Sequence, residues 1–529
     1  MQPPLPTDRT QLLERLARPA TYDLAVVGGG ATGLGVALDA AARGLSVVLL
    51  ESHDFAEGTS SRATKLVHGG VRYLAQGNIA LVREALHERT TLLRNAPHLA
   101  RPLAFVMPSY KLWETPFYGA GLKIYDALAG HAGLGPTQFL NRAETLRCLP
   151  TAMAQGLKGG VKYWDGQFDD ARLALALART AALKGALVLN HCPVSDLLYE
   201  GGKVAGVVCA DAETGRRFEV LARCVVNATG VWVDGLRQRD GEACGQRTQP
   251  LVAPSQGVHI VVDRDFLPSD HALMVPKTAD GRVLFAVPWL GKLILGTTDT
   301  PRHDLAREPV AMREEVAFIL GESARYLRRA PRAADVRSIW VGLRPLVKPQ
   351  DDDGGNTKRI SREHTVLASR SGLVTVTGGK WTTYRAMAED VLQKCMDLGL
   401  LPSRPAGATA SLPVVGANGA RAHVGLDAPQ GPHSYGSEAP CLERLPGADT
   451  ALAPGLTEAM VRFAVRHEYA RSVEDVLARR ARVLFLDARL AAALAPRVAA
   501  ILQEELPGHD PALEAFLALA RQYATVPGA

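Results

Sequence analysis

The first strongly patterned part of the chain alternates short apolar runs with a longer apolar helix. Residues 24–27 form an uninterrupted apolar run that predicts a buried strand, and a glycine-rich turn and an alanine-rich helix to about Arg43 follow. Residues 46–50 form a second apolar run that ends at Glu51. A strand, a helix and a parallel strand need about this much chain. The pattern therefore predicts one half of a Rossmann-like sheet at the beginning of the chain.

The hydrophobic pattern changes several times after this unit. Near-helical spacing over residues 78–95 predicts an amphipathic helix, and the helix and strands of residues 170–230 complete the first sheet. Short β-type runs dominate residues 250–376 and predict a substrate-binding sheet. Residues 381–398 follow a helical pattern, and helices rich in Ala, Leu and Arg fill residues 456–523.

One segment permits two interpretations. Residues 110–128 are rich in aromatic side chains and carry almost no net charge. Such a composition is typical of a surface at a membrane interface. It is equally typical of a buried lid, because composition alone does not distinguish an exposed apolar face from an internal one.

Composition narrows the class of protein. The 529 residues are 47% hydrophobic and 22% charged, which indicates a globular chain of two or three domains. A net charge of +6 without long runs of one sign favours an anionic ligand or a membrane surface over nucleic acid. The seven cysteines lack metal-ligand spacing, which favours a reducing cytoplasmic setting and no metal site. No apolar run approaches about 18 residues, so we expect neither export nor a membrane span.

A glycine fingerprint follows the first predicted strand. Gly28, Gly30 and Gly33 have the G-x-G-x-x-G spacing and open the predicted helix. Without side chains, the backbone N–H groups and the helix dipole can approach a pyrophosphate, and Glu51 is placed to accept from ribose hydroxyls. The fingerprint predicts an adenine dinucleotide, and both NAD and FAD would satisfy it.

Three further segments favour FAD. Residues 59–70 concentrate hydroxyls and glycines after the second strand, where a nicotinamide enzyme needs no such segment. Residues 227–230 place small residues where the sheet approaches the dinucleotide. Gly378, Gly379 and Lys380 precede a predicted helix, where amides and a lysine would stabilise negative charge on a reduced flavin.

Taken together, these motifs resemble those of the FAD-dependent, respiratory glycerol-3-phosphate dehydrogenases. The resemblance rests on residues 59–61, 65–74 (KLVHGGVRYL), 342–346 (GLRPL) and 378–385 (GGKWTTYR), and it extends over nearly the whole chain. It implies a D-amino-acid-oxidase-like flavoprotein fold and FAD as cofactor. It further implies oxidation of sn-glycerol 3-phosphate to dihydroxyacetone phosphate and electron transfer to membrane quinone.

The expected fold class is α/β with an α+β substrate domain. It comprises a Rossmann-like FAD-binding domain, an antiparallel-sheet substrate domain and a small helical C-terminal domain. The boundaries we expect are an N-terminal extension at 1–20, an FAD-dependent oxidoreductase region at 21–400, a linker at 401–434 and a helical C-terminal cap domain at 435–529. Inside the oxidoreductase region, the FAD-binding segments are about 21–100, 170–250 and 340–400, and the substrate-binding β segments are about 100–170 and 250–340.

A phosphorylated alcohol needs fixed cations beside the flavin. A phosphate ester carries a charge of about −2, and the planar fork of arginine matches its oxygens. Arg72, Arg344 and Arg362 are the arginines we expect to bind it, and the first two lie in family-like motifs. Hydride transfer from carbon 2 to flavin N5 also needs a base near the hydroxyl. His259 and Lys380 are both candidates, and the sequence leaves the choice open.

The complete set of expected site residues has three groups. The catalytic residues are His259, Lys380 and Arg344. The substrate-binding residues are Arg72, Tyr73, Arg344, Arg362, Lys380, Thr298 and Asp299. The cofactor-binding residues are Gly28, Gly30, Ala31, Thr32, Gly33, Glu51, Thr59, Ser60, Ser61, Thr64, Lys65, Leu66, His68, Gly69, Val194, Ala228, Gly230, Gly379, Lys380, Trp381 and Thr382.

Other functions stay open at this point. The nearest alternative is a glycerol-3-phosphate oxidase that passes electrons to oxygen, and a second is an amine or amino-acid oxidase on the same fold. An FAD-containing RNA-modifying protein is disfavoured by the absence of a Lys/Arg stripe with interleaved aromatics. We expect peripheral attachment at the inner face of the cytoplasmic membrane. The sequence does not determine the oligomeric state, for which a homodimer is one option.

Overall fold

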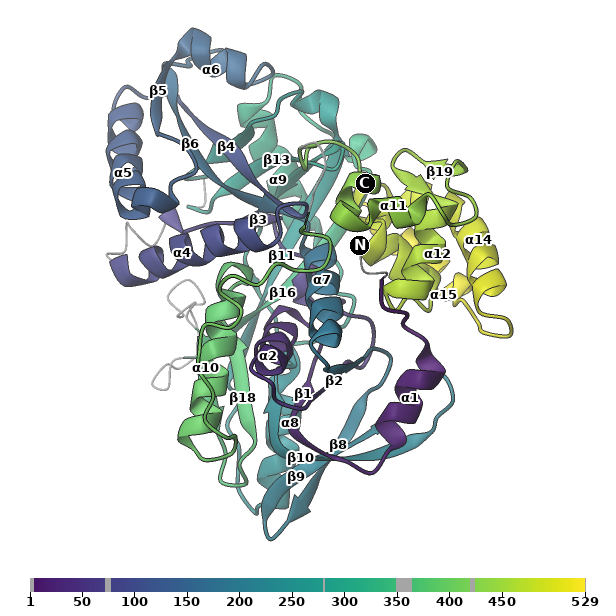
Figure 1. The fold of residues 1–529 in the computed structure, drawn as a ribbon. Coiled ribbons are helices and arrows are strands. Elements are labelled where there is room, and N and C mark those ends of the chain that lie inside the picture. Colours follow the sequence, from purple (N-terminus) through teal and green to yellow (C-terminus); the bar gives the residue numbers. More distant parts are fainter. Residues whose placement is uncertain (1–3, 72–77, 279–280, 349–363, 419–423, 529) are drawn as a thin grey trace.

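The structure is a computed structural model that describes residues 4–71, 78–278, 281–348, 364–418 and 424–528. Figure 1 shows two sheets, one in the lower and one in the upper part of the view, with the C-terminal helices packed beside them. The expected fold class is confirmed: the chain is α/β, with two large sheets and a helical C-terminal domain.

The lower sheet is mainly parallel and carries the glycine turn. Its strand order is β17-β18-β10-β1-β2-β7, and β8 and β9 add an antiparallel arm to β10. The strands are β1 (Thr21–Val27), β2 (Val47–Leu50), β7 (Leu187–Leu189), β8 (Val194–Glu200), β9 (Lys203–Ala210), β10 (Arg217–Asn227), β17 (His364–Ala368) and β18 (Val374–Gly378). The central strands are buried over most of their length, because helices cover both faces of such a sheet.

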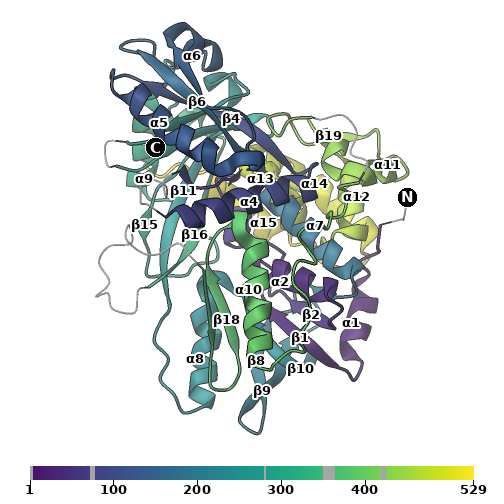
Figure 2. The same ribbon diagram turned by 60° about the vertical axis from the view of Figure 1, so that its left-hand side comes forward.

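Three helices pack closely around this parallel sheet. They are α2 (Ala31–Ala42), α7 (Asp170–Leu183) and α10 (Tyr384–Asp397), and their apolar faces share one core with the strands. Figure 2 shows α10 standing beside β18, with α2 behind it. A further helix, α8 (Val233–Ala243), lies at β18 and β8. Because α2 and α10 both begin at one end of the strands, their N-termini lie where the parallel strands end.

The upper sheet is mostly antiparallel. Its main order is β15-β11-β14-β13-β12-β4-β6-β3, with β16 paired to β11 and β5 paired to β6. The strands are β3 (Leu66–Val67), β4 (Ala100–Ser109), β5 (Gln138–Asn141), β6 (Gly159–Phe168), β11 (Val252–Asp263), β12 (Ala272–Val275), β13 (Leu284–Trp289), β14 (Lys292–Gly296), β15 (Thr300–Pro301) and β16 (Ser338–Val347). Its helices are α4 (Ile79–Asn95), α5 (Glu114–Ala129), α6 (Arg142–Cys148) and α9 (Arg313–Tyr326).

One strand lies on the other side of an expected boundary. The sequence predicts FAD-binding structure from about residue 340, whereas β16 pairs with β11 over ten residues of the upper sheet. Both strands are buried over most of their length, and this antiparallel ladder satisfies their backbone groups. In the structure the change of sheet therefore falls after Val347.

The C-terminal part is helical and shares a core with the upper sheet. It contains α11 (Ala439–Leu442), α12 (Glu458–His467), α13 (Val483–Leu486), α14 (Ala488–Glu505) and α15 (Leu513–Ala524), with a short hairpin of β19 (Ala451–Ala453) and β20 (Leu456–Thr457). Phe463 and Phe485 of this part belong to the same buried cluster as Trp289 and Trp340 of the sheet. The domain is therefore packed onto the sheet over a continuous apolar interface.

Residues 110–128, for which the sequence allowed two interpretations, form α5 and the turn before it. Leu112 is 81% exposed and Phe117 65%, and Trp113, Ile124 and Phe139 are also exposed. These five residues, which we call the α5 patch, exclude a fully buried lid for this segment. Within the part of the chain that the structure describes, no helix combines the length and apolarity needed to cross a bilayer.

Candidate active site

The glycine turn after β1 leaves no room for side chains. A Cβ on Gly28 would lie 2.6 Å from the carbonyl oxygen of Ala228, and one on Gly33 would lie 1.9 Å from that of Gly28. Gly28 also has a φ of +109°, which L side chains rarely adopt. The turn therefore needs these glycines, and it brings the N-terminus of α2 against the ends of β1 and β10.

Glu51 lies at the end of β2 beside this turn. One of its carboxylate oxygens accepts from the backbone N–H of Gly29 at 2.6 Å, and the other accepts from that of His53 at 2.9 Å. The carboxylate is half-buried. It is thus fixed at the carboxyl end of the parallel strands, the place at which such sheets bind dinucleotides.

The loop of residues 59–64 connects three parts of the molecule. The hydroxyl of Ser60 accepts from the N–H of Ala31 at 2.9 Å, and the indole of Trp381 donates to the Ser60 carbonyl at 2.8 Å. The Thr59 hydroxyl donates to the carbonyl of Leu343 in β16. The loop therefore runs from the glycine turn to the upper sheet along one wall.

A cavity of about 770 Å³ lies between the two sheets. Its walls come from the loop of residues 59–71, from β4, β6, β11, β13 and β16, and from the turn at Gly379–Thr382. Its polar lining, which we call the polar side, includes Thr64, His259, Thr298, Asp299, Arg344 and Lys380. Its apolar lining, which we call the apolar side, includes Val71, Leu81, Phe105, Met274 and Phe285. The cavity suits a ligand with one charged end beside a second, apolar ligand or ring.

Arg344 is held in place by the turn that follows β14. Its Nη1 donates to the carbonyl of Thr298 and its Nη2 to the hydroxyl of Thr297, both at 3.1 Å. Asp299 lies 3.6 Å away and accepts in turn from the hydroxyl of Ser255. The guanidinium side chain stays 26% exposed toward the cavity. A cation so fixed is preorganised for an anion.

Behind this turn lies a buried carboxylate that the sequence did not reveal. Glu315, near the start of α9, accepts from the hydroxyls of Thr298 at 2.9 Å and Thr300 at 2.6 Å. It also accepts from the side-chain amide of Gln256 at 2.6 Å. The hydroxyl of Thr298 is therefore committed to the protein, and Thr298 contributes to the cavity mainly by holding Arg344.

His259 lies in β11, directly opposite Trp340 in β16. The imidazole is almost fully buried and stacks on the indole, with ring centroids 4.0 Å apart. Its Nε2 lies 2.9 Å from the hydroxyl of Thr64. Burial, followed by the charges of Arg344 and Lys65, holds the pKa of His259 well below its ordinary value. The imidazole is therefore held in its neutral form.

The expected cofactor residues near the flavin end line the same cavity. Gly379 has a φ of +70°, which turns the chain after β18 so that Lys380 and Trp381 face the cavity. The hydroxyl of Thr382 accepts from the N–H of His68 at 3.2 Å, which joins the two cofactor loops. The lining includes Thr59, Thr64, Leu66, His68, Gly379, Lys380, Trp381 and Thr382.

Other expected residues have different surroundings. Gly69 is covered by Tyr125, whose hydroxyl accepts from its N–H at 2.9 Å. Val194 begins β8, opposite Cys209. Lys65 does not line the cavity: its side chain is fully buried in an ion pair with Asp170 at 2.7 Å. Arg72, Tyr73 and Arg362 lie outside the described residues.

Sequence reasoning missed several residues of the cavity. Besides the apolar wall, these are Arg62, Tyr163, Asp165 and Arg282. Tyr163 and Asp165 occupy alternate positions of β6, so the strand period would have placed them on one face. Nothing in the sequence indicated that this face borders the cofactor loops.

The geometry is that of a flavoprotein, and comparison with known proteins agrees. Residues 23–385 match the family model of FAD-dependent oxidoreductases, and residues 408–511 match the C-terminal domain of alpha-glycerophosphate oxidase. The chain belongs to the FAD-dependent oxidoreductase family, and its cofactor is FAD. The glycine turn, Glu51 and the loops at Ser60 and Gly379 are suited to hold it.

Within this family the chain belongs with the glycerol-3-phosphate dehydrogenases. It is 39% identical to the mitochondrial glycerol-3-phosphate dehydrogenase of Rattus norvegicus over 95% of the chain and 73% of that protein. It is 40% identical to glycerol-3-phosphate dehydrogenase SDP6 of Arabidopsis thaliana, over 91% of the chain and 82% of the relative. The structure of the Bacillus halodurans glycerol-3-phosphate dehydrogenase complexed with FAD is 29% identical, with a TM-score of 0.77 and 98% of each chain covered.

Proposed function

We propose that the chain oxidises sn-glycerol 3-phosphate to dihydroxyacetone phosphate. The observation that carries the proposal is that Arg344, Lys380 and His259 line one cavity together with the loops suited to FAD. The relatives named above, at 39% and 40% identity, support the same substrate. A dianionic phosphate with a neighbouring secondary alcohol fits two fixed cations and one neutral base.

Each of the three residues has a distinct role in this proposal. Arg344 binds the phosphate, because its fork is already oriented by Thr297 and Thr298. Bound FAD supplies the hydride acceptor for carbon 2. His259 accepts the hydroxyl proton, since its imidazole is neutral and borders the cavity. Lys380 follows two left-handed glycines at the start of a helical turn and stabilises negative charge near the reacting centre.

The decisive experiment is to add glycerol 3-phosphate to the purified holoprotein without oxygen. We expect the yellow flavin absorbance to bleach, with one equivalent of dihydroxyacetone phosphate formed for each flavin. Glycine and proline serve as matched alternatives, because amino-acid-oxidising enzymes share this fold. Bleaching by an amino acid but not by glycerol 3-phosphate would exclude the proposal.

We further propose that the electrons leave to a membrane quinone. The apolar side of the cavity, with Phe105, Met274 and Phe285, offers a surface that a planar quinone ring could contact. The α5 patch supports attachment at the inner face of the cytoplasmic membrane, because exposed aromatic and aliphatic side chains favour the lipid interface.

One observation supports a different acceptor. The C-terminal segment matches the domain of alpha-glycerophosphate oxidase, whose name implies oxygen as the acceptor in that relative. Turnover with glycerol 3-phosphate in air separates the two proposals. Rapid reduction of a soluble quinone analogue with little peroxide supports the dehydrogenase, and stoichiometric peroxide without quinone supports the oxidase.

A further inference from the structure

Lys65 forms an unusual charged cluster behind the cavity wall. Its ammonium lies 2.7 Å from a carboxylate oxygen of Asp170 and 2.7 Å from the carbonyl of Ser61. Arg482 of the C-terminal domain donates to the same two groups, at 3.1 Å and 2.8 Å. The side chains of Lys65, Asp170 and Arg482 have no exposed surface. Two cations thus share one carboxylate and one carbonyl in the interior.

Aromatic rings enclose the ammonium of Lys65. Its Nζ lies 4.6 Å from the ring centroid of Trp340, 5.0 Å from that of Trp289 and 5.4 Å from that of Phe485. Trp340 and Trp289 belong to the upper sheet, and Phe485 belongs to α13 of the C-terminal domain. A cation over such faces is attracted by the ring quadrupole, most strongly where water is excluded.

His259 stacks on the same Trp340 ring. The imidazole stacks on this indole at 4.0 Å, and Thr64, which contacts Nε2, directly precedes Lys65 in the chain. An imidazolium at this position would be a second cation on a ring that already faces an ammonium. It would also face the guanidinium of Arg344 from β16. Like charges at short range in a dry interior disfavour the protonated form.

We propose that Lys65 is a positioning residue of the reaction: its caged ammonium acts through Trp340 to keep the imidazole of His259 unprotonated when substrate binds. The C-terminal domain closes this cage with Phe485 and Arg482. The inference rests on the proposed function, because it assigns His259 the proton of the substrate hydroxyl.

The pH range over which Lys65 is charged agrees with this role. Burial, opposed by the charges of Asp170 and Asp169, lowers the pKa of Lys65 to about 7. The charge of Arg482 contributes to this lowered pKa of Lys65, and the charge of Arg344 lowers the pKa of His259. Lys65 is therefore charged below about pH 7, which is the range in which an ordinary imidazole would take up a proton. The positive charge of Lys65 is thus present in the pH range in which His259 would otherwise be protonated and unable to take the substrate proton.

The test uses the FAD-loaded full chain with Lys65→Gln and Lys65→Met. The glutamine side chain retains a hydrogen-bond donor for Asp170 and Ser61. The Lys65→Gln variant should therefore fold even if the Lys65→Met variant does not. Loss of the charge should raise the pKa of His259. We expect the acid limb of anaerobic flavin reduction by glycerol 3-phosphate to move up by about one pH unit, which is a tenfold lower rate on that limb.

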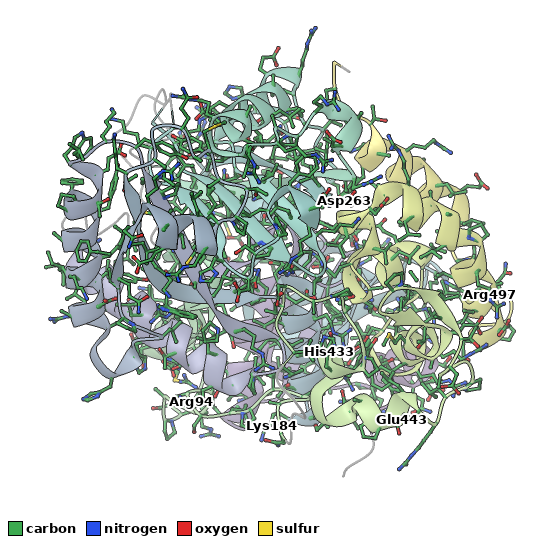
Figure 3. All side chains as sticks on the ribbon, turned by 90° about the horizontal axis from the view of Figure 1, so that it is seen from above. Arg94, Lys184, Asp263, His433, Glu443 and Arg497 are labelled. Atoms are coloured by element: carbon green, nitrogen blue, oxygen red, sulfur yellow. The ribbon has the colours of Figure 1, made fainter. Side chains whose placement is uncertain are left out.

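Lys292 provides the matched control. It also joins the upper sheet to the C-terminal domain, with Asp263 at 2.6 Å and Asp487 at 3.9 Å, but it does not belong to the cage. Figure 3 shows Asp263 beside the boundary between the sheet and the C-terminal helices. Lys292→Met should leave the acid limb in place, even if it lowers the unfolding midpoint.

A second readout does not depend on turnover. Sulfate does not titrate in this range, and a protonated His259 would add positive charge beside Arg344. In the Lys65 variants, sulfate binding followed by flavin absorbance should therefore tighten at a higher pH than in the parent protein.

The outcomes separate the two claims. If the parent protein is not bleached by glycerol 3-phosphate, the proposed function fails. If the parent protein is bleached but neither Lys65 variant moves the acid limb or the sulfate transition, the role of Lys65 is refuted and its ion pair is structural.

Discussion

Gly257 in β11 occupies a position at which the site tolerates no side chain. A Cβ there would lie 2.3 Å from Nη2 of Arg344 and 2.8 Å from the hydroxyl of Thr297. These are the two groups whose hydrogen bond orients the guanidinium. The glycine therefore fixes where the phosphate-binding fork lies, although it contacts no ligand itself.

Substituting this glycine should weaken substrate binding more than it lowers the stability of the protein. We expect Gly257→Ala to raise the KM for glycerol 3-phosphate at least about tenfold, because the displaced fork loses one of two charge-assisted hydrogen bonds. Flavin content should stay near one per chain. Gly321→Ala in α9 is the control, since a Cβ there meets nothing within 4 Å. Equal KM values in both variants would contradict the role of Gly257.

Arg344 itself should show the larger effect. Arg344→Ala should raise KM by about 100-fold, equivalent to about 3 kcal/mol for a bidentate charged pair, with bound flavin largely retained. Arg344→Lys should recover only part of the loss, because an ammonium lacks the planar fork. Steady-state kinetics with a soluble acceptor measures both. Unchanged kinetics in the alanine variant would remove Arg344 from the substrate site.

Helix α5 has an apolar face that no other part of the described structure covers. Leu122 and Tyr125 are buried, while Phe117 and Ile124 face outward. Figure 1 shows α5 at the left edge of the upper part of the molecule, and the turn in Figure 2 brings it to the front. An apolar surface of this kind marks an interaction site, since soluble surfaces rarely cluster aromatic side chains.

The α5 patch should determine vesicle binding. We expect Phe117→Glu, alone or with Trp113→Glu, to reduce co-sedimentation with anionic lipid vesicles several-fold, because a charge at the interface opposes insertion of the apolar face. Activity with a soluble quinone analogue should stay unchanged. Leu490→Glu in α14 is the control at another exposed apolar position. Equal vesicle binding by all variants would exclude this face as the membrane contact.

The whole molecule is held together by buried charges as well as by its shared apolar core. Asp54, after β2, has no exposed side-chain surface and accepts from Arg479 and Arg480 of the C-terminal domain. It also accepts from the side-chain amide of Asn190 at 3.0 Å. One carboxylate of the FAD-binding part thus pairs with two guanidinium groups of another domain, of which Arg479 also pairs with Glu474 and Asp475.

Removing this carboxylate should destabilise the molecule strongly. Asp54→Ala takes from the buried guanidinium of Arg480 the carboxylate that pairs with it, whereas Arg479 keeps Glu474 and Asp475. Breaking a buried ion pair in this way typically costs about 3–5 kcal/mol. Urea unfolding of the holoprotein measures the change. Asp265→Ala removes an exposed partner of Arg329 and should cost no more than about 1 kcal/mol. A similar small cost for both variants would show that Asp54 does not hold the domains together.

Much of the site could be predicted because its signals are local. The apolar runs, the glycine spacing and Glu51 predict one βαβ unit, and these interactions act within a few residues of each other. Arg344 and Lys380 were indicated by short motifs. The structure brings both to the polar side of the cavity, and their roles in catalysis remain proposals.

Other features depend on contacts between distant parts of the chain. The motif predicted Lys65 as a cofactor residue, but its side chain pairs with Asp170 and lies beside Phe485 of the C-terminal domain. Likewise, whether residues 110–128 are covered depends on what packs against them. Strand β16 belongs to the upper sheet because it pairs with β11, a strand about 80 residues earlier in the chain.

The sequence by itself determined the dinucleotide-binding half and the family, because periodicity and spacing act over short distances. Only the tertiary structure decided which charges share a buried carboxylate, which apolar face stays exposed and which ring stacks on His259. The physical reason is that burial and pairing energies depend on neighbours that folding supplies, and these lie far away along the chain.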